Sequence, residues 1–185
     1  MLSKINKKIF IYIFLFLILG SLNNKNLIRI EPPSISIINV TGLAEKENEN
    51  IIVNLESFKL QNLFTLNKSE IKRILNSNNL IEKYTIFKRY PSTLEIQIIQ
   101  AKFLAKVVKN GKTFYLGSNG KLINSDTKKI KLPLIFGEFE KKNFFDLLKV
   151  INNSNFDFKE INKLFFFNSG RWDIETYSGI LIKLP

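Results

Sequence analysis

The sequence has few of the residue types on which enzyme chemistry usually depends. It contains no cysteine and no histidine, which excludes thiol nucleophiles, imidazole bases and zinc sites built from either side chain. One pair of carboxylates remains of interest, because Glu138 and Glu140 occupy alternate positions and could converge on a substrate. The adjoining Lys141 and Lys142 instead favour a solvated charged loop. We predict no catalytic residue, no cofactor and no metal site, and retain a carboxylate-dependent hydrolase as the enzymatic alternative.

A second segment, Gly117–Lys121 (GSNGK), combines glycines with a lysine as phosphate-binding loops do. It lacks the GxxxxGK spacing of those loops and precedes a predicted strand instead of a helix. Asn119-Gly120 is typical of a tight hairpin turn. We therefore predict a turn here and no phosphate site.

The composition is that of a basic globular chain. Lys and Arg number 28 against 16 Asp and Glu, which gives a net charge of +12, and 45% of the residues are hydrophobic. The bases occur singly or in pairs and form no long run with interleaved aromatics, so we predict no nucleic-acid binding. Without disulfides, the hydrophobic core alone must stabilise any exported domain.

The N-terminus has the charge order of an exported or membrane-anchored protein. Residues 1–8 carry three lysines, and Ile9–Leu19 is an unbroken apolar run. The short run favours a cleaved signal peptide, whereas the lack of a small-x-small cleavage site favours a retained anchor. We predict a cytoplasmic tail at 1–8, a transmembrane anchor at 9–26 and a linker at 27–33. The lysines predict a cytoplasmic N-terminus, with everything after the anchor outside.

The pattern of apolar residues in 34–102 predicts a small α+β domain. Apolar residues recur at strand spacing at both ends of the segment and at helical spacing between them. Pro91 lies between two predicted strands, at a bend where its missing N–H does no harm. The expected elements, in chain order, are a strand at 34–40, a helix at 45–55, a helix from Asn67 to about Asn78, and strands at 81–89 and 94–98.

This order of elements resembles a POTRA domain, a module found on the outer side of bacterial membranes. The phrase KRYPSTLEIQI, which contains Arg89–Leu94, resembles the hairpin of one family, the FtsQ/DivIB cell-division proteins. Ile38–Leu43 and Leu60–Leu75 are similar to that family's first POTRA strand and to its connection into the second helix. Tyr90 stands where the family usually has tryptophan.

Residues 103–185 predict a mainly antiparallel β domain with one helix. Short alternating segments and Asn-Gly turns indicate strands, and an apolar stripe near residues 144–151 indicates the helix. Tyr115–Ile123, Leu132–Gly137 and Arg171–Pro185 resemble, in order, segments of the FtsQ/DivIB β domain. By this resemblance we expect residues 103–185 to lack the family's last helix and strand.

The resemblance implies a non-enzymatic scaffold of the cell-division machinery. Such a protein spans the inner membrane once, has its domains in the periplasm and gathers at the division septum. Its expected partners are small single-pass coiled-coil proteins of the FtsB and FtsL kind, and its expected role is to help regulate septal peptidoglycan synthesis. The alternative is a POTRA-containing periplasmic assembly or secretion factor that binds exported polypeptides.

The strand near the end of the sequence is the predicted partner-binding site. Its residues Ile180, Ile182 and Leu184 alternate, and a partner strand could pair with its edge by β-augmentation. The competing interpretation is that these residues only complete the core. On the binding hypothesis, a proline at Ile182 weakens partner binding more than it lowers the melting temperature.

Overall fold

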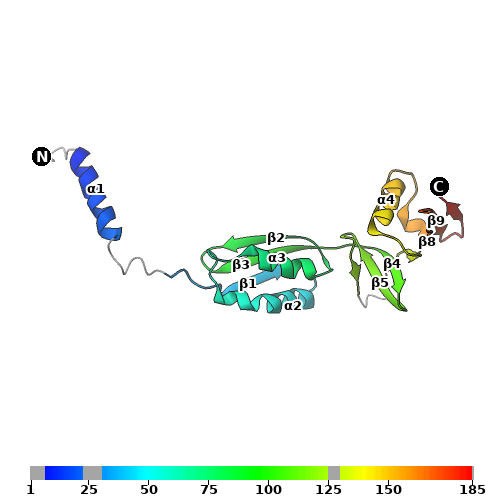
Figure 1. The fold of residues 1–185 in the computed structure, drawn as a ribbon, viewed down its shortest axis with the longest axis horizontal. Coiled ribbons are helices and arrows are strands. Elements are labelled where there is room, and N and C mark those ends of the chain that lie inside the picture. Colours follow the sequence, from blue (N-terminus) through cyan, green and yellow to red (C-terminus); the bar gives the residue numbers. More distant parts are fainter. Residues whose placement is uncertain (1–6, 23–30, 125–129, 185) are drawn as a thin grey trace.

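The computed structural model describes residues 7–22, 31–124 and 130–184, which form an N-terminal helix and two β-sheets (Figure 1). Helix α1 (Lys7–Leu22) has 16 residues, and its side chains from Lys7 to Ser21 are exposed. Within the described residues, no helix is both long enough and apolar enough to span a bilayer. The predicted anchor at 9–26 is thus not confirmed, and residues 23–26 lie outside the described ranges.

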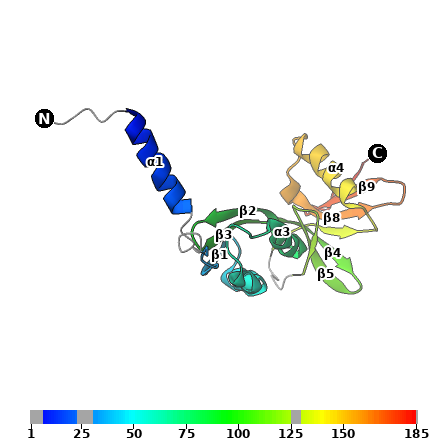
Figure 2. The same cartoon turned by 60° about the vertical axis from the view of Figure 1, so that its left-hand side comes forward.

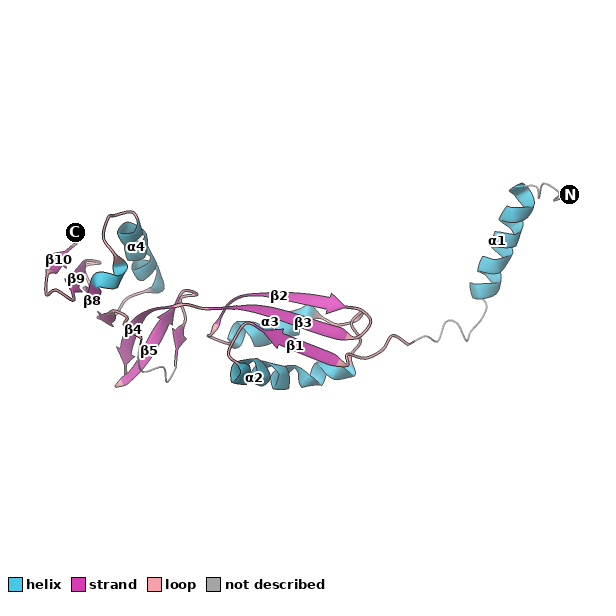
Figure 3. Cartoon of the chain, turned by 180° about the vertical axis from the view of Figure 1, so that it is seen from behind, coloured by secondary structure: helices cyan, strands magenta, loops and turns pink. Residues whose placement is uncertain are grey.

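The first sheet has three strands with two helices on one face (Figure 3). Its strand order is β1-β3-β2, in which β1 runs parallel to β3 and β2 runs antiparallel to it. This is the predicted sequence of strand, two helices and two strands. The elements are β1 (Ile37–Thr41), α2 (Glu45–Leu55), a 3-10 turn (Glu56–Leu60), α3 (Lys68–Ser77), β2 (Ile81–Arg89) and β3 (Thr93–Gln100).

The alternation of β3 explains why the helices cover one face of this sheet. Leu94, Ile96 and Ile98 are buried, whereas the intervening positions are mostly polar. The helices contribute buried leucines and isoleucines at helical spacing to the same core. Helix α3 begins as its sequence predicts, because the Asn67 side chain accepts a hydrogen bond of 2.9 Å from the backbone N–H of Ser69.

The second sheet has seven strands in the order β10-β9-β8-β7-β4-β5-β6. Of the six strand pairings among the described residues, four are antiparallel, while β7 runs parallel to both neighbours. The domain is therefore mainly antiparallel, as predicted. Its elements are β4 (Phe103–Lys109), β5 (Lys112–Gly117), β6 (Leu122–Ile123), β7 (Leu134–Phe136), α4 (Lys141–Asn152), a 3-10 turn (Phe158–Glu160), β8 (Ile161–Phe166), β9 (Trp172–Thr176) and β10 (Leu181–Lys183).

Helix α4 covers one face of this second sheet. Its buried Phe144, Leu147 and Ile151 form the predicted apolar stripe, and they join one core cluster with Leu164 and Ile174 of the sheet. The side chains that alternate with these buried residues along each strand lie on the opposite face of the sheet. No helix of the described residues covers that face. That uncovered face matters for the site described below.

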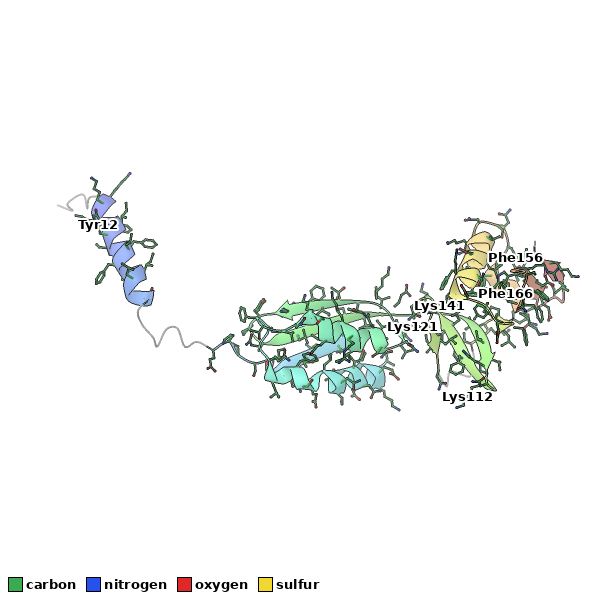
Figure 4. The ribbon with its side chains drawn as sticks, viewed as in Figure 1. Tyr12, Lys112, Lys121, Lys141, Phe156 and Phe166 are labelled. Atoms are coloured by element: carbon green, nitrogen blue, oxygen red, sulfur yellow. The ribbon has the colours of Figure 1, made fainter. Side chains whose placement is uncertain are left out.

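The turn Gly117–Lys121 forms hydrogen bonds between the two domains. Asn119 Nδ2 donates hydrogen bonds of 2.8 Å to the backbone carbonyls of Asn79 and Ile81 in the first domain. Lys121 adds bonds to two further carbonyls of that domain, and Figure 4 shows Lys121 at the junction. A small apolar cluster packs beside the turn; its members are Leu80, Ala101, Phe103, Tyr115, Ile123 and Leu132.

The chain enters and leaves the first domain at opposite ends. In Figures 1 and 2, the segment after α1 reaches the sheet beside the turn between β2 and β3, and β3 leads away to β4 at the far end. Hydrogen bonds fix the first of these ends, because Ser36 N–H donates to the Ser92 carbonyl at 2.9 Å.

Candidate partner-binding strand edge

Strand β10 forms one edge of the seven-stranded sheet. It pairs antiparallel with β9, and no other strand of the described residues pairs with its outer side. A tight turn brings it back along β9, with Gly179 at φ +84° and a 3.0 Å hydrogen bond from Gly179 N–H to the Thr176 carbonyl. The predicted strand near residue 180 is therefore present, and its outer edge is free for pairing within the part of the chain that the structure describes.

The hydrogen bonds to β9 determine which backbone groups of β10 are available. Thr176 N–H donates to the Ile180 carbonyl at 3.0 Å, and Leu184 N–H donates to the Trp172 carbonyl at 2.9 Å. Bonded pairs alternate along an antiparallel ladder, so Ile180, Ile182 and Leu184 direct their backbone groups toward β9. Leu181 and Lys183 direct theirs outward. The sequence hypothesis named the inward-bonded residues and missed the two with outward-directed groups.

The side chains of β10 divide between the two faces of the sheet. Ile182 and Leu184 are half-buried and pack against the core beneath α4. Leu181 and Lys183 lie on the uncovered face and are exposed. Ile180, at the turn, is also exposed. A strand added to this edge would present alternate side chains next to Leu181 and Lys183, where the partner's chemistry could be selected.

Charged pairs lie immediately behind the edge on the same uncovered face. Leu181 is opposite Glu175, whose Oε1 forms an ion pair with Lys163 Nζ of β8 at 2.9 Å. Lys183 is opposite Asp173, whose Oδ1 lies 3.1 Å from Arg171 Nε. The exposed side chains of the edge are therefore apolar Leu181 and basic Lys183, each next to an ion-paired carboxylate of β9. This surface suits a partner strand with apolar and acidic side chains.

The two carboxylates considered as a catalytic pair, Glu138 and Glu140, lie just before helix α4. Glu140 immediately precedes α4, and its backbone N–H donates a 3.0 Å hydrogen bond to Asn143 Oδ1 at the start of that helix. Glu138 and Glu140 line a shallow hollow with aromatic rings, Phe139 and Phe166. Within the described residues, no group of three acidic side chains could hold a metal ion.

The hairpin that carries the family phrase contains an exposed ion pair. Arg89 Nε donates to Glu95 across β2 and β3. This hydrogen bond lowers the pKa of the Glu95 carboxyl, and a second one from Gln97 Nε2, at 2.8 Å, lowers it further. The hydrogen bond with Glu95 in turn raises the pKa of Arg89. The pair fixes the two strands beside Tyr90 and Pro91.

Comparison with known proteins identifies the class of the first domain. Residues 34–99 match the family model of the POTRA domain, FtsQ-type. The chain therefore contains a POTRA domain, followed by a β domain of seven strands.

A curated cell-division protein is similar to most of the chain. The chain is 24% identical, over 147 residues, to the cell division protein FtsQ of Rickettsia bellii (strain RML369-C), and the match covers 79% of this chain and 55% of that protein. The chain is thus similar to FtsQ along most of its length, and its FtsQ-type POTRA match includes the hairpin phrase. It spans about half the length of this relative.

A comparison with solved structures gives a partial match. The major extracytoplasmic domain of the trans isomer of the cell division protein DivIB from Geobacillus stearothermophilus aligns with 46% of this chain and 78% of that chain, at 14% identity and a TM-score of 0.36.

Proposed function

We propose that this protein is a non-enzymatic scaffold of bacterial cell division, which binds FtsB- and FtsL-type partners and so helps to regulate septal peptidoglycan synthesis. The outer edge of β10, which no other strand of the described residues pairs with, is the observation that carries the proposal. An unpaired strand edge attracts other strands, and proteins usually shield one unless it binds something. The FtsQ-type POTRA match and the similarity to a cell division protein FtsQ supply the biological setting.

The proposal places the protein in the inner membrane at the septum, with its N-terminus cytoplasmic and both sheets periplasmic. Helix α1 supports an anchor, because every side chain from Ile9 to Leu19 is apolar and exposed. Its 16 residues extend about 24 Å at 1.5 Å per residue, somewhat less than the ~30 Å hydrocarbon layer. The adjoining sequence completes the proposed anchor at 9–26.

The experiment that tests the binding edge is a proline substitution at an outward-directed position. Lys183→Pro removes an N–H that points away from β9, so it blocks an added strand while preserving the β9–β10 bonds. We expect the tagged full-length protein, purified from detergent-solubilised membranes, to retain two small single-pass coiled-coil proteins. Lys183→Pro should lose them, whereas the matched control Lys183→Ala should keep them.

Proline at Ile182 serves as the contrast. Because Ile182 bonds inward to β9, Ile182→Pro should lower the melting temperature and partner recovery together, contrary to the expectation from sequence. Lys183→Pro should keep a melting temperature close to that of Lys183→Ala. Full recovery of both partners with Lys183→Pro would show that β10 is not the docking strand.

A further inference from the structure

Three exposed apolar side chains form a patch at one end of the POTRA domain. Leu60 is 90% exposed, Phe64 61% and Tyr90 57%. The rings of Phe64 and Tyr90 contact each other with centroids 4.7 Å apart, although they come from different loops. Leu60 ends the 3-10 turn that leads into the loop carrying Phe64, so exposed apolar side chains gather at this end of the domain. We call these three residues the apolar tip.

The loop beneath the apolar tip is held in place by hydrogen bonds. Asn62 Oδ1 accepts from the backbone N–H groups of Phe64 and Thr65, each at 3.0 Å. Lys88 Nζ donates to the carbonyls of Leu63 and Leu66, at 2.7 and 3.1 Å. The loop therefore presents Leu60 and Phe64 to solvent from a fixed backbone.

The N-terminal segment enters the domain between the two loops of the apolar tip. Ile35 N–H donates to the Gln61 carbonyl at 2.9 Å, and Ser36 N–H donates to the Ser92 carbonyl, also at 2.9 Å. Ile35 lies 13 positions after Leu22, the last residue of α1. A fully extended chain covers about 3.4 Å per residue, so Ile35, which bonds to the loop of the apolar tip, lies within about 44 Å of that helix. Whatever surface holds α1 is the surface nearest the apolar tip.

We propose that the apolar tip rests in the headgroup layer of the bilayer that holds α1. This inference depends on the anchor in the proposed function. Tyrosine and phenylalanine favour the interface between headgroups and hydrocarbon, because they combine an apolar body with a polar or polarised edge. Lys59 and Arg89 flank the patch, each ion-paired with a carboxylate (Glu56 and Glu95), and the chain as a whole carries +12. An anionic membrane surface complements that charge.

The contact limits how the POTRA domain is oriented above the membrane. A linker alone would let the domain tumble, whereas a second attachment at the apolar tip makes the long axis of the sheet stand up from the surface. The β domain leaves the opposite end (Figure 1) and is therefore held away from the bilayer.

The test uses the absence of native cysteine. Full-length protein with a single cysteine at Gln61, an exposed position beside the patch, is labelled with an environment-sensitive nitrobenzoxadiazole probe. The control is a single cysteine at Val150, exposed on α4 in the other domain. Both are reconstituted in vesicles of phosphatidylglycerol and phosphatidylethanolamine that contain a headgroup spin-labelled lipid. We expect strong quenching at position 61 and little at position 150.

A triple variant, Leu60→Ser with Phe64→Ser and Tyr90→Ser, should reduce the quenching at position 61 to the level at position 150. Its melting temperature should stay near that of the parent, because all three side chains are exposed. Quenching that is equal at the two positions, or unchanged in the triple variant, would overturn the membrane contact. Flotation of the same vesicles after a high-salt wash tests the anchor separately. Protein that floats without quenching refutes the apolar tip alone, whereas protein that does not float refutes the anchor and, with it, this inference.

Discussion

Arg171 neutralises the buried carboxylate of Asp173, which lies in β9 next to β10. The side chain of Asp173 is only 6% exposed, and its Oδ1 lies 3.1 Å from Arg171 Nε. The guanidinium also lies 4.7 Å from the ring centre of Phe167, in a cation–π contact. Removing one partner of such a pair leaves a charge in a poorly solvated place, which costs more than the pair contributes.

We expect Arg171→Gln to lower the free energy of unfolding by about 2 kcal/mol. Lys163→Gln is the matched control, because it removes a basic partner from Glu175 on the same face of the sheet. That carboxylate is 27% exposed, so water can replace the lysine and the loss should stay within ~0.5 kcal/mol. Urea unfolding of the two variants measures the difference, and equal losses would contradict the dependence on burial.

Single-residue roles were only partly predictable from the sequence. The capping of α3 by Asn67 follows from local chemistry, and the structure confirms it. The burial of Asp173 has no local signal, because it depends on neighbours that the fold brings together from other strands. The same is true of the contact between Phe64 and Tyr90, which are 26 positions apart in the sequence and meet only because two loops share one end of the domain.

The turn from β1 into α2 needs glycine at position 42 for two reasons. Gly42 has φ +114°, and a Cβ built there would lie 1.8 Å from the backbone oxygen of Ile98 in β3. The close approach lets α2 cross over the sheet directly after β1. Any larger residue would have to push the two strands apart.

Gly42→Ala should therefore lower the free energy of unfolding by more than about 2 kcal/mol, the sum of an unfavourable φ and a backbone clash. Gly111→Ala separates these two effects, because Gly111 has φ +71° but open space around its Cβ direction. It should cost about 1 kcal/mol. Thermal unfolding of both variants tests the comparison, which fails if Gly42→Ala is no worse than Gly111→Ala.

Elements were easier to predict than their pairing. The strand at 81–89 and the helix at 45–55 appear with the predicted bounds, because each has a clear period in its apolar residues. The first strand begins later than predicted, at Ile37, since Ser34–Ser36 bond to neighbouring loops instead of a strand. The alternation of apolar residues in β10 could not predict which residues direct their backbone groups outward. A period of two in the side chains does not reveal which backbone groups face the neighbouring strand.

Contacts at and beside the turn Gly117–Lys121 couple the two domains. Asn119 joins them by two hydrogen bonds from its side-chain nitrogen, while its Oδ1 accepts from Lys121 N–H at 2.9 Å and so shapes the turn itself. Asn79 Nδ2 returns a bond of 2.9 Å to the Leu122 carbonyl. These contacts, with the apolar cluster beside them, orient the β domain on the POTRA domain.

We expect Asn119→Ala to broaden the distribution of distances between the domains. Spin labels on cysteines at Val53 in α2 and Val150 in α4, both exposed, report that distance by electron paramagnetic resonance. Asn48→Ala is the control, since its side chain bonds to the Leu43 backbone inside the POTRA domain. It should destabilise that domain without changing the interdomain distribution. An unchanged distribution in Asn119→Ala would show that the remaining contacts set the orientation without Asn119.

The parallel pairing of β1 with β3 determines how the molecule carries tension. Force from the N-terminal tether would pull β1 backward from its first residue, while force from the β domain would pull β3 forward from its last. Because the two strands run in the same direction, these pulls slide one past the other and load all the bonds from Ile37↔Thr93 to Thr41↔Gln97 at once. A sheet in this arrangement yields by shear instead of unzipping bond by bond. The parallel register of β1 and β3 therefore lets the POTRA domain resist tension applied at its two ends.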